Sequence, residues 1–111
     1  MNAKPKTGAL LVLASQGQWE TILQMLQTTA FSRFIPEVAE AFEARGDERG
    51  AIDRADAVSY LQIAFWCRWV LVERSKSLDQ RAERGADMMR MKEKLDAAMA
   101  LEDATPRADP V

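Results

Sequence analysis

The chain has 111 residues, 48% apolar and 29% charged, a composition that suits one globular domain with a single core. Its net charge of −2 and its pI of about 5.2 exclude a strongly positive surface, so we expect neither nucleic acid nor a membrane as a partner. One cysteine excludes an internal disulfide, and the lack of histidine excludes histidine-based catalysis and most zinc sites.

The first apolar run, GALLVLA, follows Lys4 and Lys6 and resembles the start of a signal peptide. The run is at the short limit for such a peptide, and polar SQGQ follows it without a small-x-small cleavage site. A single cysteine also fits a reducing compartment. We therefore expect a cytoplasmic protein.

Helical spacing dominates the chain, and no stretch alternates with the period of a strand. The first helical region covers residues 9–29. Gly17 is a candidate interruption, and Ser15 with Gln18 offers a capping box for a second piece. In that piece, one face gathers the apolar side chains Trp19, Ile22, Leu23, Met25 and Leu26.

The next helix begins near Pro36, which suits a first helical turn, and ends at Gly46, a natural C′ residue. A turn GDERGA follows, and Asp53 starts a helix that we expect to reach about Arg84, with residues 75–77 as a candidate break. The last helix covers residues 86–101, where Met88, Met91, Leu95 and Ala98 have the a and d spacing of a helix seam.

These elements predict an all-α fold, a bundle of about four helices in one domain over residues 1–102. Residues 103–111 are polar and contain two prolines, which predicts a disordered tail.

Residues 57–72 form the most apolar segment, with thirteen apolar residues of sixteen on every side of the helix. Such a helix must be enclosed by other helices, a second subunit or lipid. Sixteen residues span about 24 Å, short of the roughly 30 Å hydrocarbon core of a membrane. Because Trp66 and Trp69 are too large for short neighbours to cover, we expect a homodimer with this helix at or beside the interface. Cys67 should be buried and unreactive.

Seven carboxylates and three arginines lie between Ile35 and Asp56. Glu37 and Glu40 suit the positive end of a helix dipole, and Asp53 suits an N-cap with Asp56 as its capping-box partner. The other three acids, Glu43, Asp47 and Glu48, we expect to be solvated. In this interpretation each of the four paired acids has a structural role and no metal is bound.

A second interpretation takes Glu37, Glu40, Asp53 and Asp56 as a metal site. If the turn folds the two helices antiparallel, both pairs would converge, and four close carboxylates repel unless a cation is present. Oxygen ligands of this kind favour magnesium, manganese or calcium.

The residues EVAE, twelve intervening residues and then DRADAVSYL resemble the motif of the all-α MazG-like nucleotide pyrophosphatases. By position, Glu37 and Glu40 match the second and third acids of its E-E-x-x-E element, and Asp53 and Asp56 match its E-x-x-D. Pro36 stands in place of the first acid, and Asp53 in place of a glutamate. The resemblance covers residues 36–70. It implies a helical oligomer that binds magnesium and cleaves nucleoside triphosphates between the α and β phosphates.

These sequence features support two hypotheses about the function of the protein. The first is a small non-enzymatic helical interaction protein, an adaptor, regulator or inhibitor of another macromolecule, that acts as a homodimer without a cofactor. Its predicted contact surfaces are Trp66 with Trp69, and Met88 with Met91 and Leu95. The alternative is a magnesium-dependent nucleoside triphosphate pyrophosphatase of the MazG-like kind. The sequence leaves the question of enzymatic activity open.

Overall fold

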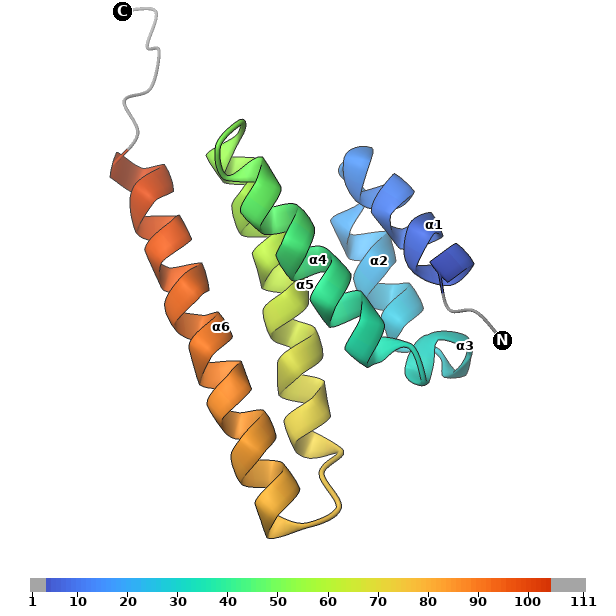
Figure 1. The fold of residues 1–111 in the computed structure, drawn as a ribbon. Helices are drawn as coiled ribbons and strands as arrows, with labels where there is room; N and C mark the ends of the chain where they lie inside the picture. The colour runs from blue at the N-terminus through green and yellow to red at the C-terminus, as the bar shows by residue number, and fades with distance from the viewer. Residues whose placement is uncertain (1–3, 105–111) are drawn as a thin grey trace, which may run out of the picture.

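The computed structural model describes residues 4–104, and within this range it contains helices and turns but no strand (Figure 1). The helices are α1 (Lys4–Ser15), α2 (Trp19–Leu26), α3 (Thr29–Ser32), α4 (Ile35–Arg49), α5 (Arg54–Glu73) and α6 (Leu78–Ala104). The all-α prediction is confirmed. The described range holds six helices rather than about four, because the first region divides and α3 adds a single turn.

The three longest helices form the body of the molecule. Figure 1 shows α4, α5 and α6 running alternately up and down, with α1 and α2 on the side of α4 and α5 that lies away from α6. The molecule measures 54 × 29 × 20 Å. Residues 105–111 of the predicted tail lie outside the described range, whereas Asp103 and Ala104 still belong to α6.

The break between α1 and α2 falls at Gly17, as the sequence predicts. Gly17 has φ +73°, its N–H donates to the Ala14 carbonyl at 3.0 Å, and the Gln18 N–H donates to the Leu13 carbonyl at 3.0 Å. This is the Schellman ending of a helix, which favours glycine at the left-handed position. The predicted capping box is wrong, because the Ser15 hydroxyl donates back to the Val12 carbonyl and Gln18 caps nothing with its side chain.

Helix α5 is enclosed on most sides, as its apolar surface requires. Nine of its residues are buried, and Cys67 is fully inaccessible. Burial raises the pKa of the Cys67 thiol to about 12, which keeps it protonated and unreactive. Within residues 4–104, no helix combines the length and the apolar character that a membrane crossing needs.

The predicted long helix from Asp53 ends earlier than expected, at Glu73, and residues 75–77 form the break. The Gln80 N–H donates to the Ser77 hydroxyl oxygen at 3.1 Å, and the Gln80 side-chain oxygen accepts from the Lys76 N–H at 2.7 Å. This reciprocal pair starts α6 at Leu78 and resembles a capping box. The S-x-x-Q spacing is the sequence signal that marks this start.

Helix α4 continues past Gly46 to Arg49, so the predicted ending at Gly46 is wrong. Gly46 is buried and lies against α5. A Cβ atom at this position would come within 2.8 Å of Leu61 Cδ2 and 3.3 Å of Tyr60 Cβ. Glycine is present because it lets the two helix backbones approach, not because it ends the helix.

Gly46→Ala is expected to lower the free energy of unfolding by about 1 kcal/mol. Overpacking costs about 1–3 kcal/mol, and the better helix propensity of alanine returns only about 1 kcal/mol. Urea denaturation followed by circular dichroism measures the change. Gly85→Ala in α6 is the matched control, because nothing lies within 4 Å of its added Cβ. That variant should be stabilised by about 0.5–1 kcal/mol. Equal stabilisation of both variants would contradict the close contact.

Candidate interaction groove

Asp53 and Asp56 lie together where α4 meets α5. Asp53 is the N-cap of α5, and its side chain accepts a hydrogen bond from the Asp56 N–H at 3.1 Å. The Asp56 carboxylate binds Arg49 Nε, at the end of α4, at 2.7 Å. Both acids therefore have partners that fasten the α4–α5 turn.

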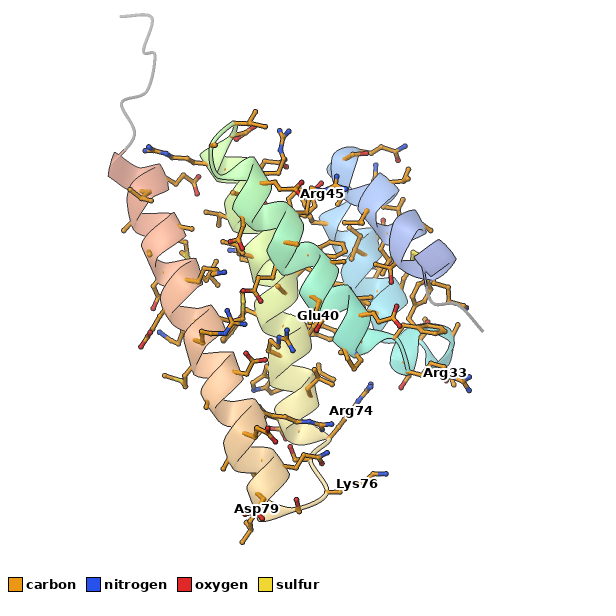
Figure 2. All side chains as sticks on the ribbon, viewed as in Figure 1. Arg33, Glu40, Arg45, Arg74, Lys76 and Asp79 are labelled. Carbon is orange, nitrogen blue, oxygen red and sulfur yellow. The ribbon has the colours of Figure 1, made fainter. Side chains whose placement is uncertain are left out.

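Glu37 and Glu40 are exposed near the start of α4. Arg49, which binds Asp56, is nine residues beyond Glu40, about 14 Å along the helix axis. Figure 2 shows Glu40 closer to the beginning of α4 than to the turn. The structure does not bring the two acid pairs together, since an antiparallel hairpin apposes only residues equally distant from its turn. Among residues 4–104, no three acidic or cysteine side chains lie close enough to hold a metal. Magnesium binding by these acids stays a prediction.

Glu43 is the acid at the centre of an ion network, not a solvated residue as the sequence suggested. Its side chain is 13% exposed, and its carboxylate accepts from Arg90 at 2.6 and 2.9 Å and from Lys94 at 2.7 Å. Arg68 of α5 lies 4.0 Å from Glu43 and 3.0 Å from Asp87 of α6. The network joins α4, α5 and α6, and its role is structural.

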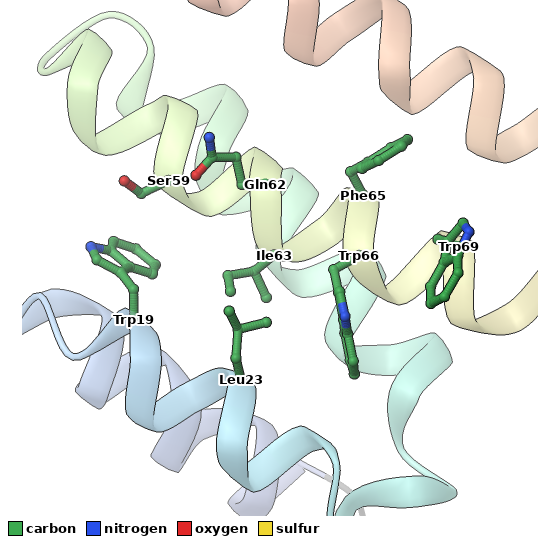
Figure 3. A pocket seen from close by; sticks show the side chains of 8 residues that line it. All are labelled: Trp19, Leu23, Ser59, Gln62, Ile63, Phe65, Trp66 and Trp69. Atoms are coloured by element: carbon green, nitrogen blue, oxygen red, sulfur yellow. The ribbon is translucent and has the colours of Figure 1, made fainter.

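An apolar opening with a volume of about 470 Å³ lies between α2 and α5. Figure 3 shows Trp19 and Leu23 of α2 facing Ile63 of α5, with Trp66 and Trp69 farther along α5. We call this the α2–α5 groove; its lining residues are Trp19, Leu23, Ser59, Gln62, Ile63, Phe65, Trp66 and Trp69.

The two tryptophans predicted as contact residues both line this groove. Trp69 is 48% exposed, and Trp66 is half-buried. On the α2 side, the Trp19 ring packs edge-on against Tyr60, with centroids 5.0 Å apart and planes at 84°. This contact fixes the Trp19 ring, so one wall of the groove is rigid.

The groove is uncharged, because none of its eight lining residues is acidic or basic. Its polar groups are the Ser59 hydroxyl and the Gln62 amide, and the three indole N–H groups are further donors. The Gln62 amide has no hydrogen bond to any residue of the described range. Such a surface suits an apolar occupant that also makes a few directed hydrogen bonds.

The second predicted contact surface needs a correction. Met91 is 0% and Leu95 8% exposed, so both belong to the core and are not available to a partner, while Met88 is half-buried. The a and d spacing does predict a packing seam on α6, but this seam packs against other helices of the same chain. The side chains that α6 leaves exposed include Met89 at 50% and Met99 at 42%.

The sequence pattern does not mark Trp19 and Leu23 as partly exposed residues, because they share the apolar face of α2 with buried side chains. The structure buries Ile22 and Leu26 of that face, at 0% and 1% exposure, and leaves Trp19 and Leu23 half-buried. The one available signal was the width of the face, with five apolar residues among eight.

Comparison with known proteins found no matching family model, no matching curated protein and no matching solved structure.

Asp53→Ala is expected to lower the free energy of unfolding by about 1 kcal/mol, the usual value of an N-cap carboxylate. Because the capping contact needs no metal, the loss should be the same with and without millimolar magnesium. Thermal unfolding in both conditions measures it. A wild-type chain that magnesium stabilises, with the effect absent in Asp53→Ala, would instead support the metal site.

Glu43→Gln is expected to lower the free energy of unfolding at pH 7 by about 1–3 kcal/mol, because it removes the charged acceptor that Arg90 and Lys94 share and leaves them only Asp87 and Asp47. Hydrogen bonds from Arg90 are the largest cause that lowers the pKa of Glu43 from 4.5 to about 2; burial opposes them and Lys94 adds to them. A lowered pKa stabilises the fold above pH 4.5, and the contribution disappears as the pH falls toward 2.

Urea titrations from pH 7 to pH 2 should therefore show the difference between wild type and Glu43→Gln shrinking below pH 4.5. Glu48→Gln is the control, since the Glu48 side chain is 72% exposed and lies 3.6 Å from Arg45. It should change stability by less than about 0.5 kcal/mol. An equal loss in both variants would show that the Glu43 network is not special.

Proposed function

We propose that this chain is a small non-enzymatic helical interaction protein that acts as a homodimer and binds another macromolecule as an adaptor, regulator or inhibitor. The observation that carries the proposal is the uncharged α2–α5 groove, with Trp69 half in solvent at its end. Apolar grooves lined by aromatic side chains are typical of surfaces where helices dock.

The energetic reason is the cost of leaving indole surface in water. A tryptophan side chain presents on the order of 200 Å², so covering the exposed half of Trp69 removes about 100 Å² from water. At roughly 25 cal/mol per Å², that burial stabilises a complex by about 2–3 kcal/mol. Trp19, Leu23 and Trp66 add further area in the same groove, so its closure by a helix is favourable.

Two exposed methionines of α6 are available for the other macromolecule. Met89 and Met99 of α6 are 50% and 42% exposed and lie near the polar side chains of Lys92 and Asp96. Methionine adapts its shape to different partners, and charged neighbours give a contact its orientation. These α6 side chains replace Met91 and Leu95 as the proposed partner surface.

Met89→Glu is expected to abolish capture of the partner macromolecule, because it places a charge in an apolar contact. Immobilised wild-type and variant chains, exposed to extract of the producing cells, are compared by quantitative mass spectrometry. Ile52→Glu is the matched control, since Ile52 is 72% exposed in the α4–α5 turn. The same captured proteins on all three chains would contradict the α6 partner surface.

A further inference from the structure

We propose that a second copy of this chain occupies the α2–α5 groove, with the two α5 helices antiparallel and a two-fold axis close to Trp66. This interface rests on the homodimer proposed above and specifies its surface and direction. It closes the apolar opening between α2 and α5.

The spacing of the groove residues on α5 is that of a helix-pairing seam. Ser59, Gln62, Trp66, Trp69 and Glu73 follow one another at intervals of three, four, three and four residues. This 3.5-residue repeat keeps one stripe facing a neighbouring helix. The four stripe residues that line the groove, from Ser59 to Trp69, span about 15 Å, nearly three helical turns. An elongated helix fits this stripe better than a compact ligand does.

The order of hydrogen-bonding groups along the stripe selects the antiparallel direction. Around an axis at Trp66, Trp69 of one copy faces Ile63 and Gln62 of the other, and its indole N–H can donate to the Gln62 side-chain oxygen. In the same pairing Glu73 faces Ser59, whose hydroxyl can donate to the carboxylate. A parallel pairing would instead place Glu73 against Glu73, and like charges repel.

Three of these groups, Gln62, Glu73 and Ser59, are weakly bonded within the chain. Gln62 is exposed and makes no hydrogen bond with the described residues, and the Glu73 side chain is 53% exposed with one ion pair, at 4.0 Å, to Arg81. The Ser59 hydroxyl donates to the Ala55 carbonyl over a long 3.4 Å, and it would exchange this weak bond for one to the Glu73 carboxylate of the other copy. Gln62 keeps its donors and acceptor, and Glu73 keeps acceptors, for a second copy.

The charge of the face permits a dimer. Helix α5 is about 30 Å long and about 10 Å wide, and α2 widens this face over about 12 Å, which gives roughly 400 Å² in projection. A stable interface buries about 800 Å² of accessible surface on each partner, so the relief of the face and residues beside the groove have to supply the remaining area. A net charge of −2 per chain opposes association only weakly.

The first test is the molar mass of the full chain in solution, measured by light scattering over a range of concentrations. Wild type and Ile52→Glu should both be dimers. Trp69→Glu should dissociate at least about 100-fold more readily, because a charge replaces a central aromatic anchor. Unchanged circular dichroism shows that this variant is folded. A monomeric wild type, or a Trp69→Glu variant that dimerises equally well, overturns the inference.

The second test is disulfide trapping, which reads the direction of pairing. Native Cys67 stays in the chain because it is fully buried. Chains with Ser59→Cys and with Glu73→Cys, mixed and oxidised, should form a disulfide between unlike chains, whereas either variant alone should not. Disulfides within each variant alone would indicate parallel pairing, and their absence in every mixture would indicate a different interface; both results overturn the inference.

The two proposals fail separately. A monomeric wild type that still captures a macromolecule through Met89 overturns the groove dimer and leaves the interaction function in place. A dimer through Trp69 from which Met89→Glu removes no captured partner supports the groove dimer and overturns the α6 partner surface. Saturation of the groove of a monomeric chain by an apolar dye, read from tryptophan fluorescence, would show that it is a ligand site instead.

Discussion

The apolar surface of α5 is the constraint on which the rest of this structure depends. Nine of its residues are buried, and the neighbouring helices are arranged so that each covers one side. Gly46 brings α4 close on one side, and the seam of Met91 and Leu95 brings α6 close on another. The side facing α2 stays partly open.

The ion network around Glu43 fixes the alignment of the three long helices along their axes, which apolar packing alone does not. Apolar contacts between helices tolerate sliding along their axes, whereas the Glu43 carboxylate has to meet Arg90 and Lys94 of α6 at hydrogen-bonding distance. Arg68 of α5, 3.0 Å from Asp87, ties the third helix into the same register. This partly buried ion network therefore favours one alignment of the three long helices.

The sequence predicted features that depend on neighbouring residues and missed those that depend on packing. Gly17 and Asp53 were identified correctly, because a left-handed helix ending and an N-cap are local chemistry. The predicted role of Gly46 is wrong, because glycine suits both a helix ending and a close contact between helices. The sequence does not show that Leu61 of α5 lies against this position, and that contact decides the role. Likewise, the spacing of Met91 and Leu95 predicted a seam but not that the same chain fills it.

One side of α5 is partly open because α2, which covers it, is much shorter than α5. Helix α2 has 8 residues and α5 has 20, which correspond to about 12 and 30 Å, so α2 covers less than half of its neighbour. Trp19 and Leu23 meet the first part of the stripe, and Trp69 lies beyond the end of α2. A longer α2 would have closed this side within one chain. Because the chain turns at residues 27–28 into α3 and then α4, α2 does not reach the remaining stripe, and this is the surface on which the proposed dimer places α5 of another copy.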